Sequence, residues 1–161
     1  MKMELSNAQK VAFGGVIAAL YVVLTIVANA LGLASGAIQV RFSEALTILP
    51  VFTATAVPGL TVGCLLANLI TGCALWDVVF GSLATLIGAA GTRLLRKKPM
   101  LAWIPPVISN MVIVPIVLQQ VYGVPDAWWY MVLTVGAGEV ISCGILGLLL
   151  YHSIKNIPQL K

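Results

Sequence analysis

Two long uncharged stretches dominate the first half of the chain. Val11 to Val40 contains thirty residues without a charge, and Ala45 to Trp76 contains thirty-two more. Only the short string VRFSEAL, which carries Arg41 and Glu44, separates them. A membrane-spanning helix needs about 20 apolar residues. The first stretch therefore predicts one spanning helix, whereas the second is too long for a single one.

Turn and charge signals divide the chain into six apolar segments. Pro58-Gly59 is expected to break the second stretch, because proline removes a backbone donor and clashes with the preceding helical turn. The six predicted helices cover about Ala8–Leu31, Val40–Val57, Leu60–Leu75, Asp77 to the basic run Arg93–Pro99, Met100–Tyr122 and Ala127–Tyr151. No polar linker divides the chain. We predict an all-α integral membrane bundle of six transmembrane helices, forming a single domain over residues 1–161.

Composition and charge support this prediction and give it an orientation. The chain is 60% hydrophobic and 9% charged, with a mean hydropathy of +1.05, whereas soluble domains carry roughly 25% charged residues. With six alternating helices, eight basic residues fall on one side and only Arg41 on the other. The positive-inside rule then places both termini in the cytoplasm of a multi-pass cell-membrane protein. The basic residues form no stripe interleaved with aromatics, so we expect no nucleic-acid partner.

Polar side chains within the spans are the candidate functional residues. An ionisable group at membrane depth costs about 2.5–3.5 kcal/mol, so it usually faces a cavity or a partner. These groups fall mostly in the outer half of the predicted bundle, which indicates a cup that opens outward. The candidate substrate-binding residues are Arg41, Glu44, Asn68, Trp76, Asp77, Asn110, Trp128 and Glu139.

Several of these residues also have a purely structural interpretation. Arg41 and Glu44, three positions apart, could form an ion pair at a helix end. Trp128 could be one of the aromatic residues that line membrane interfaces. Asn68 and Asn110 could form hydrogen bonds between helices.

Glu139 is the hardest residue to explain without a function. A carboxylate at membrane depth with no basic residue in its own helix needs a proton or a cationic partner. Asp126 is expected to be a solvated N-cap of the last helix. Small residues on the first helix allow close approach of another helix, either within the domain or in a partner protein. They are Gly14, Gly15, Ala18 and Ala19.

Motifs for enzymatic chemistry are missing. The chain has no phosphate-binding loop, no zinc-protease motif and no hydrolase nucleophile motif. Its three cysteines fit neither a zinc spacing nor a disulfide framework. We therefore predict no metal, no cofactor and no enzymatic activity.

Three strings carry a family resemblance: QVRFSEALTILPVFT, TAVPGLTVGCLLANL and LWDVVFGSLATLIGA. The chain resembles the substrate-binding S components of energy-coupling factor (ECF) vitamin transporters, and specifically the QueT family, whose proposed cargo is a queuosine precursor. The resemblance covers essentially the whole length. It implies an outward pocket capped by the loop Gly32–Gln39. It also implies that the first helix contacts a transmembrane coupling protein, EcfT, which two ATPase subunits drive for uptake.

A queuosine precursor such as aminomethyl-deazaguanine or queuine would suit the polar residues. Its guanine-like edge presents adjacent N–H donors to a carboxylate, and its ring carbonyl needs a donor such as Arg41 or an asparagine. We expect Glu139 or Glu44 on the guanine-like edge and Asp77 near the mouth. Three alternatives stay open: an S component for another vitamin, a proton-coupled small-cation transporter, and a membrane enzyme, which the lack of a nucleophile–base pair disfavours.

Overall fold

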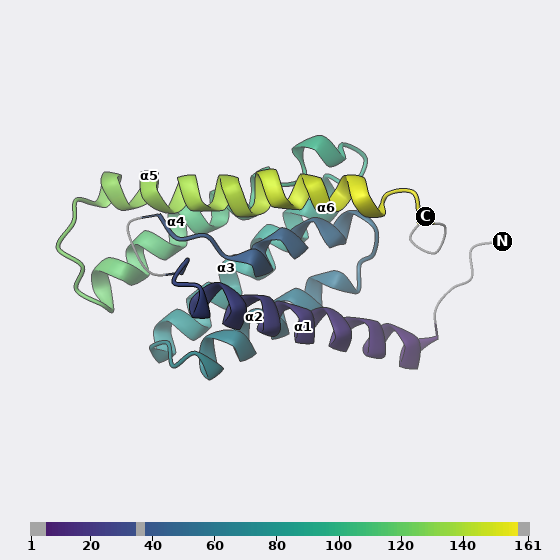
Figure 1. The fold of residues 1–161 in the computed structure, drawn as a ribbon, viewed down its shortest axis with the longest axis horizontal. Coiled ribbons are helices and arrows are strands. Elements are labelled where there is room, and N and C mark those ends of the chain that lie inside the picture. Colours follow the sequence, from purple (N-terminus) through teal and green to yellow (C-terminus); the bar gives the residue numbers. More distant parts are fainter. Residues whose placement is uncertain (1–5, 35–37, 158–161) are drawn as a thin grey trace.

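The computed structural model describes residues 6–34 and 38–157. In this part of the chain all regular secondary structure is helical. The expected capping loop is only partly described, because residues 35–37 lie outside these ranges. The elements are α1 (Asn7–Ala30), η1 (Phe42–Val51), α2 (Ala56–Ile70), α3 (Leu75–Leu94), η2 (Pro99–Leu101), α4 (Ile104–Gln120), α5 (Trp128–Glu139), η3 (Val140–Leu146) and α6 (Gly147–Ile154). The last three form one continuous rod along the bundle (Figure 1).

Within the described ranges, four helical segments are long and apolar enough to cross a membrane: α1, α3, η2 with α4, and the rod α5–η3–α6. The other two, η1 and α2, are apolar but shorter, with 10 and 15 residues. The all-helical prediction is confirmed, and the crossing of the membrane by all six segments stays a prediction. The start of α1 and the end of α6 lie at the same end of the molecule (Figure 1).

Two predicted local features were wrong. The break in the second apolar stretch lies at residues 52–55, ahead of Pro58, which sits in the first turn of α2. Proline is tolerated there because the first N–H groups of a helix have no intrahelical partner. Asp126 does not cap the last helix. Helix α5 begins at Trp128, so Ala127 takes the N-cap position, and no side chain caps the helix.

The central element is η1, a 3₁₀-helix that packs against α1, α3, α6 and η3. Ten residues is long for this helix type, whose runs rarely exceed three to four. Helix ends leave backbone carbonyls without partners. Here Nη1 of Arg93, from α3, donates to the carbonyls of Pro50 and Val51 at 3.0 and 3.3 Å. Arg93 therefore binds the last two carbonyls of this helix and stabilises its C-terminal end.

Helix α1 packs closely on α2 through glycine. A Cβ atom added to Gly63 would lie 2.8 Å from Cβ of Tyr21 and 3.0 Å from Cα of Ala18. One turn earlier, a Cβ on Gly59 would lie 2.8 Å from the carbonyl oxygen of Gly14. Two of the four small residues of α1, Gly14 and Ala18, thus pack inside the domain. The other two, Gly15 and Ala19, are exposed.

We expect Gly63→Ala to destabilise the bundle by about 1–3 kcal/mol, because overpacking forces helices apart. The measurement is thermal unfolding of the purified protein in detergent. Gly15→Ala is the matched control, since its added Cβ meets nothing within 4 Å. Equal melting temperatures for the two variants would contradict the close approach of α1 and α2.

Candidate functional site

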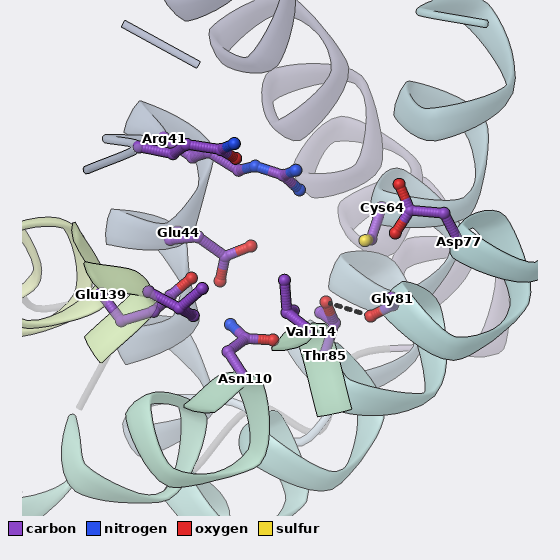
Figure 2. A pocket seen from close by; sticks show the side chains of 11 residues that line it. Arg41, Glu44, Cys64, Asp77, Gly81, Thr85, Asn110, Val114 and Glu139 are labelled. Carbon is purple, nitrogen blue, oxygen red and sulfur yellow. Dashed lines mark hydrogen bonds between the residues drawn. The ribbon is translucent and has the colours of Figure 1, made fainter. Parts of the chain in front are cut away.

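A narrow polar cavity lies inside the bundle. About 490 Å³ of space not filled by atoms lies in this cavity and at its mouth, and this figure includes open solvent. The lining residues come from the segment before η1 and from η1, α2, α3, α4 and α5 (Figure 2). They are Gln39, Arg41, Glu44, Cys64, Asp77, Gly81, Thr85, Asn110, Val114, Val135 and Glu139.

The charges of the lining are unbalanced. One guanidinium, Arg41, faces three carboxylates, those of Glu44, Asp77 and Glu139. When all three are ionised, the lining carries a net charge of −2. Charges interact more strongly in a protein interior than in water. This cavity therefore favours a cationic or donor-rich ligand over an anionic one.

Glu44 is held deep in the wall by its neighbours. It is 2% exposed, and Oε1 accepts a hydrogen bond from the hydroxyl of Tyr21 on α1. The thiol of Cys143 approaches its other oxygen at 4.0 Å. The hydroxyl of Thr47 donates to the backbone carbonyl of Glu44 at 2.6 Å. These contacts fix the carboxylate and tie α1 to η1.

Glu139 ends α5 where the π-helical stretch η3 begins. Cys143 on this stretch donates through Sγ to Oε2 of Glu139 at 3.2 Å. Ser142 accepts from the backbone N–H of Arg41 at 3.1 Å and donates to the carbonyl of Gly138 at 2.9 Å. π-Helical turns are rare and often lie at functional sites. Here the wide turn brings one carboxylate and the backbone of Arg41 to the same cavity.

Arg41 extends over Glu44 into the cavity (Figure 2). It lies within electrostatic range of Tyr21, Glu44 and Asp77. Among the described residues, its guanidinium makes no hydrogen bond and no ion pair within 4 Å. The interpretation of Arg41 and Glu44 as a helix-end ion pair is therefore wrong. The reason is geometric: the guanidinium passes across the carboxylate and points into the cavity.

Asp77 lies in the first turn of α3 and is fixed from the loop that follows α4. Its Oδ2 accepts from the hydroxyl of Tyr122 at 3.0 Å, and the same hydroxyl accepts from the N–H of Ala74 at 3.0 Å. Burial and the neighbouring Asp77 carboxylate raise the pKa of Tyr122. The phenol therefore stays protonated and able to donate at neutral pH.

A family model described as "QueT transporter" matches residues 11–156. The chain belongs to the QueT transporter family. A curated relative from Lactococcus lactis subsp. cremoris (strain MG1363), named "Queuosine precursor transporter QueT", is 33% identical over 86 residues. This match covers 53% of the chain and 50% of the relative, so the chain spans about half the length of the curated relative it matches. No solved structure matches significantly.

Membership of the QueT transporter family agrees with the long apolar helices of the described residues, which suggest a multi-pass membrane protein. Five of the eight candidate residues of this QueT family member line one cavity: Arg41, Glu44, Asp77, Asn110 and Glu139. They come from segments spread over a hundred residues of sequence.

The three other candidates lie outside the lining. Asn68 is 3% exposed behind the wall, where its Nδ2 donates to Sγ of Cys64 at 3.6 Å. Trp76 and Trp128 are 60% and 49% exposed. Trp76 stacks on Phe80, with ring centroids 5.9 Å apart. The structure therefore gives neither tryptophan a stacking position in the cavity.

Sequence reasoning missed several contributors to the site. Tyr21 supports Glu44. The only feature of the sequence that could have indicated this role is the polar pair that Tyr21 forms with Thr25, one turn away on an apolar helix. Oγ1 of Thr25 lies 2.9 Å from the carbonyl oxygen of Tyr21, to which it donates, and 2.9 Å from the hydroxyl of Ser43. Cys64 and Thr85 also line the cavity, but both residue types are common in apolar helices.

We expect Gly138→Ala to loosen the segment that carries Arg41. A Cβ atom at this position would lie 2.0 Å from the backbone oxygen of Gln39, so the segment must move away. Hydrogen–deuterium exchange over residues 38–42 should become faster. Gly147→Ala on the same helical rod is the control, because its Cβ would make an ordinary contact of 3.5 Å. Unchanged exchange in the Gly138 variant would contradict the close contact.

Proposed function

We propose that this chain is the substrate-binding S component of an ECF-type transporter and binds a queuosine precursor for uptake. The observation that carries the proposal is the polar cavity inside an otherwise apolar bundle, lined by three acids and one arginine. The family match and the name of the Lactococcus relative support the choice of cargo.

The lining suits a flat deazaguanine. Glu139 can accept two hydrogen bonds from the adjacent N–H groups of the guanine-like edge. Arg41 and Asn110 can donate to the ring carbonyl. Val114 and Val135, the two apolar members of the lining, can contact the faces of the bicycle. An S component for an anionic vitamin would need several basic residues here, and the lining contains one.

We place both termini in the cytoplasm and the mouth of the cavity on the outside. The support is the charge bias of the sequence, in which Arg41 stands alone against eight basic residues. The start of α1 and the end of α6 lie at one end of the bundle (Figure 1), which is consistent with an even number of crossings.

The purified protein should bind a 7-deazaguanine saturably without ATP. Glu139→Gln should weaken this binding at least about tenfold, because it removes a charge-assisted hydrogen bond. Isothermal titration in detergent measures both affinities. Asp126→Asn is the control, since Asp126 is exposed and lies outside the cavity.

Two outcomes would contradict this proposal. Wild-type affinity in the Glu139 variant would remove this residue from the site. Uptake into vesicles by the chain alone, driven by a pH gradient, would favour the proton-coupled small-cation transporter instead.

We further propose that the exposed small residues of α1, Gly15 and Ala19, contact the transmembrane coupling protein EcfT, which works with two ATPase subunits. Small side chains let helices approach closely in a membrane. Gly14 and Ala18 are already packed on α2, so they would support this face from behind.

Ala19→Leu should therefore reduce recovery of co-expressed coupling protein and ATPases on an affinity-tagged chain, while ligand binding stays unchanged. Ala90→Leu on α3 makes the same change at another exposed alanine and should leave recovery intact. Equal recovery with both variants would exclude this face of α1 as the contact.

A further inference from the structure

The cavity has acidic groups on two opposite sides. Asp77 comes from the start of α3 and Glu139 from the end of α5 (Figure 2). Helix α4 packs against both α3 and α5 and contributes Asn110 to the lining. A ligand that fills the cavity can therefore meet one carboxylate at each end.

The two ends differ in what surrounds the carboxylate. Glu139 lies beside the Asn110 amide and accepts from the thiol of Cys143 at 3.2 Å. This mixture of donors and acceptors suits the edge of a heterocycle. Around Asp77 the lining residues are Cys64 and Gly81 (Figure 2). Arg41 lies within electrostatic range of this carboxylate, but among the described residues it makes no hydrogen bond or ion pair with Asp77 within 4 Å. Asp77 therefore keeps acceptor capacity for a positively charged group of a ligand.

Tyr122 determines how Asp77 is presented. A backbone N–H can only donate, so the bond between Ala74 and Tyr122 makes the phenol oxygen an acceptor. The phenol proton is then directed at Oδ2 of Asp77, 3.0 Å away. Burial and Asp77 raise the pKa of Tyr122, which keeps this proton in place. The result is a carboxylate with one oxygen fixed.

The second oxygen of Asp77 lies near Gly81, which lines the cavity. A Cβ atom at Gly81, one turn further along α3, would lie 3.7 Å from Oδ1 of Asp77. Gly81 has no such atom and itself lines the cavity. The same Cβ would lie only 3.0 Å from Nδ2 of Asn68. Glycine at this position therefore avoids a close contact with the Asn68 amide while Oδ1 stays at the edge of the cavity.

We propose that Asp77 binds the cationic substituent of the ligand, and that Tyr122 is a positioning residue that makes the site select a cationic deazaguanine over a neutral one. This inference rests on the proposed function and assigns the two ends of its site. Glu139 with Asn110 holds the guanine-like edge, and Asp77 holds the amine.

The test compares two probes that share the same bicycle: 7-aminomethyl-7-deazaguanine, which is cationic, and 7-cyano-7-deazaguanine, which is neutral. Isothermal titration of the purified full-length protein should show tighter binding of the cationic probe. Tyr122→Phe should weaken the cationic probe about tenfold, because it removes a hydrogen bond to a charged group. The affinity of this variant for the neutral probe should stay within about twofold of the wild-type value.

Two further variants make the test specific. Asp77→Asn removes the charge but keeps the shape, and it should abolish the preference for the cationic probe. Tyr130→Phe is the control. Tyr130 is an exposed tyrosine in the first turn of α5, and it does not contact Asp77. It should leave both affinities unchanged.

The outcomes separate this inference from the proposed function. Wild-type protein that binds neither probe overturns the proposed function and the inference with it. Wild-type protein that binds both probes equally overturns the inference alone. An equal loss for both probes in Tyr122→Phe, at unchanged melting temperature, also overturns it, since a merely structural role would not distinguish charge.

Discussion

The cost of burying a carboxylate among apolar helices constrains the whole arrangement of this bundle. A group such as Glu44 needs hydrogen-bond donors or a polar space, and it has the phenol of Tyr21 on one oxygen and a path to the cavity. That bond links α1 to η1, and the glycine contacts of α2 hold α1 in place behind Tyr21. The packing of three helices therefore serves the position of a single acid. The other acids meet the same requirement by facing the same cavity.

Irregular helices solve the problem of bringing these groups together. A 3₁₀-helix has three residues per turn, so positions i and i+3 lie directly above each other. Arg41 and Glu44 stand in that relation at the start of η1, and both reach the cavity. The π-helical stretch η3 faces η1 and carries Cys143, which lies 3.2 Å from Glu139 and 4.0 Å from Glu44.

Much of the fold could be predicted from the sequence, because hydropathy is a physical requirement of the membrane. The six apolar segments and the five polar candidates that line the cavity follow from the cost of polar groups in lipid. The break near Pro58 was misplaced because proline is tolerated in a first helical turn. The sequence alone does not say on which side of the proline the helix starts. The types of helix in η1 and η3 depend on packing between distant segments. Trp76 and Trp128 could not be assigned, because membrane interfaces and ligand sites both favour tryptophan.

The imbalance of charge around the cavity is the strongest argument about the class of ligand. A protein that bound an anionic vitamin would have to remove three carboxylates from water without any compensating cation except Arg41. A cationic ligand instead supplies the missing positive charge at the moment it binds, so the same residues that are costly in the empty cavity become favourable contacts. The guanidinium of Arg41 then has an acceptor in the ring carbonyl of the ligand, which the described residues do not provide. On this argument, the features that destabilise the empty cavity are the ones that select its ligand.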